Sequence, residues 1–246
     1  MKYLLIFHLF FLAASLAWSN EERLVAAVFY VEPFGFKNQK GEISGATSDI
    51  IKAIENKSGI RVVQVLLPYK RMIESLKTGS IDFAIFFRSK LGDTFTKRII
   101  PLYDLKTIVV GRKGTKGTKG TNITGYDDLY GIKLATTLGV QYNPQFDDDK
   151  QLQITYARDY DGAILKLLHK NVDAIISPEK ILYYQLKKLG LKKDILGMYY
   201  VLHTNTAWLQ FSKLSKNKQY INALKSSIQS LKEEDKINQI LNSYFY

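Results

Sequence analysis

The order of strands and helices constrains the fold of this chain more than any other feature of its sequence. Three short apolar runs rich in β-forming residues alternate with two segments that have the spacing of amphipathic helices. The apolar runs are 23–30, 61–67 and 81–87, and the helical segments are 47–59 and 69–79. This order favours a parallel sheet with right-handed crossovers. A strand, a helix and a strand follow again at 132–137, 160–171 and 172–177, so the sequence predicts an α/β fold with two similar halves.

Local signals predict where some of these elements begin and end. Thr47 or Ser48 is the predicted N-cap of the first helix, and Gly59 is its predicted stop. A further strand is predicted after Pro101, over 104–113. The tandem repeat "GTKGTKGT" at 114–121 is interpreted as a hairpin tip or loose loop, because glycine, threonine and lysine explain such a segment without a function.

An acid stands at the start of an apolar run in each half of the chain. Asp82 follows the turn "KTGS", and Asp173 follows the turn "HKN". A carboxylate there can accept hydrogen bonds from turn amides, so both acids are expected to be structural. In open α/β sheets, ligands bind outside the carboxyl ends of the strands. The repeated arrangement therefore predicts two lobes with "FFRSK" (86–90) facing "ISPEK" (176–180) across one cleft.

The first residues are typical of a secretory signal. A lone Lys2 precedes an apolar run too short to span a bilayer stably, and small residues follow it. We expect residues 1–19 to be removed, with cleavage after Ser19 preferred and cleavage after Ala17 as the alternative. No later segment has the apolar length of a membrane helix, so the mature chain is expected in the periplasm without a membrane span.

Composition narrows the chemistry further. The absence of cysteine excludes disulfides, thiolate metal sites, a cysteine nucleophile and a lipid anchor on a thiol. The formal net charge of +12 comes from lysines scattered over helical faces and turns, which is unlike a nucleic-acid surface. His169 and His203 lie far apart in the sequence, and no phosphate-cradling loop, dinucleotide fingerprint or nucleophile elbow occurs. We therefore expect no metal, no cofactor and no enzymatic activity.

Six segments in order resemble one family. They are "VFYVEPFGF…KGEISGATSDI", "LPYKRMIESLKTGSIDFAI", "PLYDLKTIVV", "YDDLYGIKLATTLGVQY", "VDAIIS" and the closing "AWLQFSKLSKNKQYINALKSSIQSLKEEDKINQILNSY". Each is weak alone, but together they are similar to the family 3 extracellular solute-binding proteins, two-lobed periplasmic receptors that feed polar amino acids and related solutes to import transporters.

The resemblance implies a division of the chain that composition and spacing do not reveal. It implies a periplasmic binding protein type 2 fold, in which each lobe is a mostly parallel sheet flanked by helices. Lobe 1 would comprise 20–105 and 205–246, and lobe 2 would comprise 106–204. Two hinge crossings would lie at 105–108 and 203–206. The implied partners are a small polar solute and the membrane permease of an ABC importer, and we expect a monomer.

Candidate ligand-binding residues in the first lobe lie in a loop, at a helix start and after the third strand. The resemblance implies aromatic stacking by one of the loop residues Tyr30 and Phe34 while Glu32 meets a cation, with loop packing as the alternative. The remaining candidates are Tyr69, Arg71, Phe87 and Arg88. Arg88 is the expected carboxylate clamp, because a guanidinium donates two parallel hydrogen bonds, and a surface salt bridge is its alternative.

In the second lobe, the candidates surround a loop and the start of a helix. Thr136 and Thr137 offer hydroxyls, and the backbone amides from Gly139 to Gln141 suit an anionic group, as the resemblance also implies, with a self-satisfied turn as the alternative. Ser177 and Glu179 complete the set, with Glu179 as the expected partner of an ammonium group.

Two departures from the resembled family affect the ligand. The arginine that usually grips an α-carboxylate would fall at Thr94, and the acid that usually takes the α-ammonium is replaced by Pro178. Either Arg88 and Glu179 substitute for them, or the ligand is not an α-amino acid.

The sequence favours solute capture by hinge closure, with two alternatives. One is a periplasmic enzyme on the same scaffold, similar to cyclohexadienyl dehydratases, with Glu32 or Glu179 as general acid. The other is a ligand sensor without transport, because fold does not fix function.

Overall fold

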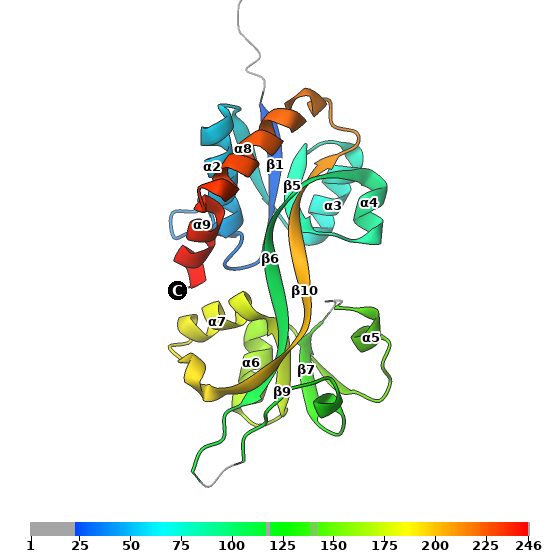
Figure 1. The fold of residues 1–246 in the computed structure, drawn as a ribbon, viewed down its shortest axis with the longest axis vertical. Coiled ribbons are helices and arrows are strands. Elements are labelled where there is room, and N and C mark those ends of the chain that lie inside the picture. Colours follow the sequence, from blue (N-terminus) through cyan, green and yellow to red (C-terminus); the bar gives the residue numbers. More distant parts are fainter. Residues whose placement is uncertain (1–22, 117–118, 139, 141, 246) are drawn as a thin grey trace, which may run out of the picture.

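The computed structural model describes residues 23–116, 119–138, 140 and 142–245. The expected signal peptide, Gly139 and Gln141 lie outside the described residues, as does part of the 114–121 repeat. Two α/β lobes are stacked along the long axis of the molecule and joined by two long strands (Figure 1). The predicted fold class, two lobes with mostly parallel sheets flanked by helices, is confirmed.

Lobe 1 follows the predicted strand and helix order. Its parallel strands β1, β4 and β5 pair in the order β4-β1-β5, with α2 and α3 as crossovers. A two-stranded hairpin lies before α2, and a short helix follows β5. The bounds are β1 Leu24–Phe29, β2 Phe36–Lys37, β3 Ile43–Ser44, α2 Ala46–Ser58, β4 Val62–Leu67, α3 Tyr69–Thr78, β5 Phe83–Phe87 and α4 Lys90–Phe95.

Lobe 2 repeats the parallel arrangement on a smaller scale. β7 pairs in parallel with both β8 and β9, and the helices α6 and α7 pack against the sheet. The bounds are η1 Asp127–Leu129, β7 Lys133–Thr137, α5 Pro144–Asp147, β8 Gln153–Ala157, α6 Tyr160–Leu168, β9 Ala174–Pro178, α7 Glu179–Lys188 and η2 Lys193–Ile195.

The two connecting strands are β6 (Thr96–Arg112) and β10 (Leu196–Ser212), which pair antiparallel with each other along the molecule. In lobe 1, β10 also pairs antiparallel with β5, and in lobe 2, β6 pairs antiparallel with β9. One sheet thus runs through both lobes in the order β4-β1-β5-β10-β6-β9-β7-β8. The predicted lobe limits at 105/106 and 204/205 fall within β6 and β10, and as domain limits they stay predictions.

The prediction that a strand begins after Pro101 was wrong, because β6 begins at Thr96 and runs through this proline. Proline removes a ladder hydrogen bond and is tolerated in a strand at bulges. The pairing of β6 with β10 has a register shift between Ala207 and Trp208, and Trp208 is the partner of Pro101.

The end of the chain returns to lobe 1. After β10 come η3 (Lys218–Tyr220), α8 (Ile221–Glu233) and α9 (Lys236–Phe245). Leu224, Ile228 and Leu241 of these helices share one buried cluster with Ile50 and Ile54 of α2. Figure 1 shows α8 and α9 beside α2 on one side of lobe 1.

The repeated acids tie neighbouring strands together. Asp82 accepts a hydrogen bond of 2.7 Å from the amide of Val25 in β1, and Asp173 accepts one of 2.8 Å from the amide of Lys133 in β7. Their structural role is as expected, but both amides belong to the start of the adjacent parallel strand rather than to a turn. The same hydrogen bond thus fixes the first strand of each lobe beside the strand that follows the crossovers.

Candidate ligand-binding cleft

A cleft with a volume of about 550 Å³ lies where the carboxyl ends of the strands of both lobes meet the connecting strands. Lobe 1 contributes residues from β1, the loop after it, the start of α3 and the end of β5. The connecting strands and lobe 2 supply the rest. The lining residues are Phe29, Val31, Phe34, Tyr69, Ile85, Phe86, Phe87, Arg88, Ser89, Tyr103, Leu105, Leu138, Val140, Tyr142, Tyr160, Pro178, Ile181, Asn205 and Ala207.

Aromatic rings dominate the side of the cleft formed by lobe 1. Phe34 is buried, and its ring is stacked on that of Tyr103 with 6.1 Å between centroids and 8° between planes. The Tyr69 ring meets Phe29 edge to face at 6.3 Å, and half of Tyr69 is exposed. Because Tyr69 is the first residue of α3, the turn of backbone after Pro68 places this ring at the mouth of the cleft. It is available to cover a bound molecule.

Two tyrosines of lobe 2 line the opposite side of the cleft. Tyr142 shares a hydrogen bond of 2.5 Å with the Thr136 hydroxyl, and burial raises the pKa of Tyr142 to about 12. Tyr160 begins α6 after its N-cap Asp159, and burial also raises the pKa of Tyr160. Desolvation penalises a phenolate, so both rings stay neutral at physiological pH and act as apolar walls with a polar tip.

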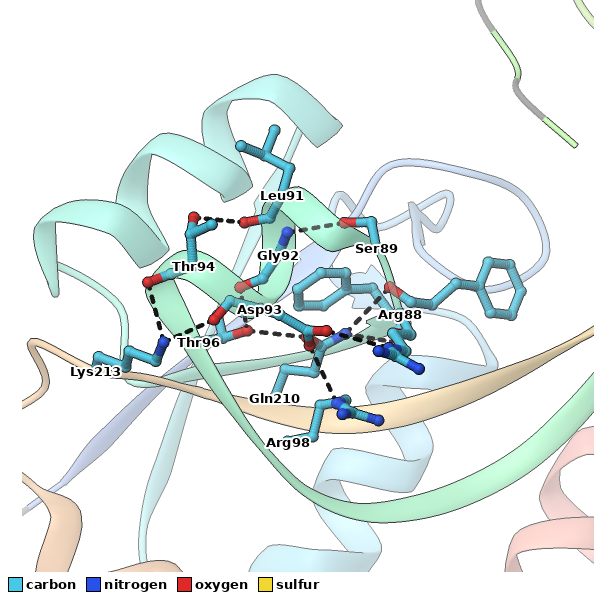
Figure 2. A network of polar contacts seen from close by, with 12 residues as sticks. Arg88, Ser89, Leu91, Gly92, Asp93, Thr94, Thr96, Arg98, Gln210 and Lys213 are labelled. Carbon is cyan, nitrogen blue, oxygen red and sulfur yellow. Dashed lines mark hydrogen bonds and ion pairs between the residues drawn. The ribbon is translucent and has the colours of Figure 1, made fainter. Parts of the chain in front are cut away.

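Arg88 is the charged side chain among the described residues that line the cleft, and it belongs to the polar network of Figure 2. Its Nε donates to Asp93 Oδ2 at 3.1 Å, and Arg98 Nε contacts Asp93 Oδ1 at the same distance. Asp93 therefore lies between two guanidinium groups, and the trio has a net positive charge. The Nη atoms of Arg88 take no part in its contact with Asp93.

The backbone beneath Arg88 is fixed by a buried amide. Gln210 of β10 donates from Nε2 to the carbonyls of Phe86 and Phe87, each at 3.1 Å, and accepts from the Thr96 hydroxyl at 2.9 Å. Ser89 caps α4 by accepting a hydrogen bond from the Gly92 amide at 2.9 Å (Figure 2). These bonds hold the end of β5 and the start of α4 at the edge of the cleft.

The structure brings four of the predicted site residues to the cleft: Phe34, Tyr69, Phe87 and Arg88. Others lie elsewhere. Tyr30 and Arg71 are exposed outside the lining, and the Ser177 hydroxyl is buried and donates to the Pro178 carbonyl. Thr136 and Thr137 are also buried, and the Thr136 hydroxyl shares a hydrogen bond with the lining residue Tyr142. Glu179 is the half-buried first residue of α7 and does not line the cleft.

Glu32 meets a cation of the protein itself. Its Oε2 accepts from Lys188 Nζ of α7 at 2.7 Å, so this ion pair joins the lobes beside the cleft. Asp161 lies near the pair, burial raises its pKa, and its Oδ1 is buried without a hydrogen bond from the described residues.

Sequence reasoning missed Ser89, Tyr103, Tyr142, Tyr160 and Asn205 among the polar residues of the cleft. Tyr142 directly follows the predicted loop 136–141, and Tyr160 opens a predicted helix, so the rule that helix starts surround a ligand could have found both. Tyr103 and Asn205 lie in the connecting strands, whose pairing no local pattern shows.

Metal clusters and membrane-spanning helices are both absent from the described ranges, which omit 1–22 and the short gaps. No cluster of three metal-ligating side chains occurs within them. None of their helices combines the length and hydropathy required to cross a bilayer.

Comparison with known proteins gives a consistent result. The model of the family described as bacterial extracellular solute-binding proteins, family 3, matches residues 25–246. A protein of Campylobacter jejuni named "Probable histidine-binding protein" is 28% identical over 171 residues, and the match covers 63% of this chain and 63% of that relative.

Solved structures share the fold at low sequence identity. A mutant of ArgBP from T. maritima has a TM-score of 0.68 at 20% identity and covers 92% of this chain and 96% of its own. A histidine kinase sensor domain with similarity to periplasmic binding proteins has a TM-score of 0.71 at 15% identity, covering 91% of this chain and 96% of its own.

Proposed function

This chain belongs to the bacterial extracellular solute-binding proteins, family 3, and we propose that it captures a small solute, an amino acid or a related molecule, in the cleft between its lobes. The single observation that carries the proposal is the cavity of about 550 Å³ whose walls come from both lobes and both connecting strands. A solute there contacts both lobes at once and stabilises the conformation in which they are closed.

The polar groups of the cleft are sufficient in number for such binding. Micromolar affinity requires about 8 kcal/mol, and hydrogen bonds to charged groups contribute about 1.5–3 kcal/mol each. Arg88, Ser89 and Asn205 offer donors, and Tyr69 offers a ring that can cover the solute. A few of these hydrogen bonds and one ring contact therefore supply a binding free energy of the required magnitude.

Closure, location and delivery form the rest of the proposal. The lobes move about residues 105–108 and 203–206, the predicted hinge segments, in which 105–107 pair with 203–205 in the middle of the β6–β10 ladder. The protein acts in the periplasm as a monomer, and the permease of an ABC importer recognises the closed form. Membership in this family supports delivery, and the expected signal peptide supports the location.

The test is a thermal-shift screen of amino acids, oligopeptides, polyamines and organic acids, followed by titration calorimetry and small-angle scattering. We expect a bound solute to raise Tm and to reduce the radius of gyration. Tyr69→Ala should weaken binding by about three- to tenfold, because an aromatic contact contributes about 0.5–1.5 kcal/mol beyond its buried area. Tyr156→Ala is the matched control, since Tyr156 is similarly exposed on β8, outside the cleft. A screen without any bound solute, or equal losses in both variants, would refute the proposal.

A further inference from the structure

The charges around the cleft differ from those that a zwitterion needs. Among the described residues that line it, Arg88 is the charged side chain and none carries a carboxylate. Gly139 and Gln141, which lie outside the described residues, are uncharged residue types. A carboxylate entering this cleft meets a guanidinium, whereas an ammonium group loses its hydration without gaining a counter-charge.

Two acids beside these residues are already engaged. Asp93 forms ion pairs with Arg88 and Arg98, each at 3.1 Å, and Glu32 forms one with Lys188 at 2.7 Å. The trio of Arg88, Asp93 and Arg98 keeps a net positive charge, which attracts an anion and repels a cation. Asp161 is the one nearby acid with a buried oxygen that accepts no hydrogen bond from the described residues. An ammonium ligand would therefore have to depend on Asp161 or on Glu179, which follows the lining residue Pro178 but does not itself line the cleft.

Donors for a carboxylate stand side by side at the end of β5. Arg88 can present its Nη atoms, because its contact with Asp93 uses Nε. The neighbouring Ser89 uses its oxygen to accept from the Gly92 amide, which leaves its hydroxyl proton for a second ligand oxygen. Gln210 fixes the backbone of this segment through the Phe86 and Phe87 carbonyls, so the donors are positioned before a ligand arrives.

The rest of the cleft suits an apolar body. The rings of Phe34, Tyr69, Phe87, Tyr103, Tyr142 and Tyr160 line it, together with aliphatic side chains. Aromatic rings bind an aromatic ring of a ligand by stacking or edge-to-face contact.

We propose that the ligand is a small carboxylic acid with an aromatic or apolar body and no ammonium group. The inference rests on the proposed function and names its class of solute. Arg88 and Ser89 bind the carboxylate, and the rings enclose the body of the molecule.

The experiment compares three molecules that share a phenylethyl body and differ in charge. They are 3-phenylpropionate, which carries only a carboxylate, L-phenylalanine, which is a zwitterion, and phenethylamine, which carries only an ammonium group. Titration calorimetry of the full mature chain should give the tightest binding for 3-phenylpropionate, at least tenfold tighter than for L-phenylalanine, and no measurable binding for phenethylamine. The pair 4-methylpentanoate and L-leucine repeats the comparison with an aliphatic body.

Two variants identify the groups that bind. Arg88→Gln should weaken binding of 3-phenylpropionate at least tenfold. Arg158→Gln should leave it unchanged, since Arg158 also contacts a neighbouring aspartate through Nε but has a side chain that is 96% exposed. Asp161→Asn should likewise leave the affinity for 3-phenylpropionate unchanged. Circular dichroism of each variant checks that it is folded.

Several results would overturn the inference. Tighter binding of L-phenylalanine or phenethylamine, loss of amine binding in Asp161→Asn, or an unchanged affinity in folded Arg88→Gln would each contradict it. If no carboxylate of the panel binds while the broad screen finds an amino acid ligand, this inference is wrong and the proposed function stands. If the broad screen finds no solute at all, both are wrong.

Discussion

His203 is the residue at which burial most directly predicts a dependence on pH. Its Nε2 lies 2.8 Å from Asn205 Nδ2, and its buried Nδ1 has no hydrogen-bond partner among the described residues. Burial lowers the pKa of His203, and Asp147 opposes that effect only in part. The folded protein therefore binds a proton at His203 less readily than the unfolded chain does.

This difference predicts a loss of stability in mild acid. When the pKa of a histidine is lower in the folded than in the unfolded state, its contribution to the free energy of unfolding is complete above the unfolded pKa of about 6.5. This contribution is lost as the pH falls below that value, because the unfolded chain then binds the proton more readily. Urea unfolding at pH 7.5 and 5.5 should give a smaller free energy of unfolding at the lower pH, and His203→Gln should reduce the difference. His169→Gln, at the exposed end of α6, is the control and should keep the parent's pH dependence. An identical pH dependence in His203→Gln would contradict the prediction.

The two acids at the strand starts, Asp82 in lobe 1 and Asp173 in lobe 2, differ in the number of hydrogen bonds that they accept. Asp82 is 5% exposed and accepts hydrogen bonds from Val25 N, from Ser215 Oγ at 2.6 Å and from Asn217 Nδ2 at 3.1 Å. It therefore joins β1, β5 and the segment after β10. Asp173 is half-buried and accepts from the Lys133 amide.

We expect Asp82→Ala to lower the free energy of unfolding by about 1–3 kcal/mol or more, because it leaves buried donors without an acceptor. Asp173→Ala serves as the matched comparison and should cost less, since its site is more open to water. Urea denaturation of both variants measures the difference. If both variants lose the same free energy of unfolding, the hydrogen bonds of Asp82 to Ser215 and Asn217 add nothing to its bond with the strand amide.

The sequence predicts elements through their period and misses what depends on distant partners. The β-α-β order, Phe87 and Arg88 follow from local patterns and from the rule about strand ends, whereas the resemblance to the family implied Phe34 and Tyr69. The predicted caps Thr47 and Ser48 were wrong, because Gly45 with φ of 119° is the N-cap of α2 and both residues are buried inside the helix. A β-carbon at Gly45 would lie 2.5 Å from the Phe34 carbonyl oxygen, a contact between separate segments that no local signal reveals.

The cleft shows the same limit. Tyr103 and Asn205 reach it only because β6 and β10 pair along their whole length, with Leu105 opposite Asn205. Glu32 was expected to meet a cation of the ligand, but its carboxylate accepts a hydrogen bond from Lys188, which lies 156 residues later. Pairing between segments so distant in sequence is set by the assembled sheet, so the identity of such partners could not be predicted.

At the scale of the whole molecule, contacts beside the cleft influence how the lobes sit together. Glu32 pairs with Lys188, and Lys180 Nζ lies 4.9 Å from the ring centroid of Phe245 in α9. Ile181 of α7 is buried in the core cluster of lobe 1. Lobe 2 therefore contacts lobe 1 through α7 as well as through the connecting strands.

We expect Glu32→Gln to shift the molecule toward more open conformations by a small amount. The side chains of Lys188 and Glu32 are 49% and 26% exposed, and ion pairs in contact with water contribute about 0.2–1 kcal/mol. The separation of fluorophores placed on the two lobes should increase, and added salt should reduce the difference from the parent. Glu74→Gln is the control, because its pair with Lys77 lies within α3. No change in separation at low salt would contradict the prediction.

The return of α8 and α9 to lobe 1 has a consequence for biogenesis. The cluster that buries Ile50 and Ile54 is not complete until Leu241 and Phe245 have left the ribosome, because all four belong to it. The amino-terminal lobe is thus the last to become complete, although its first strand is made early. The core of lobe 1 therefore stays incomplete until the whole chain is available, which delays the final packing of this lobe.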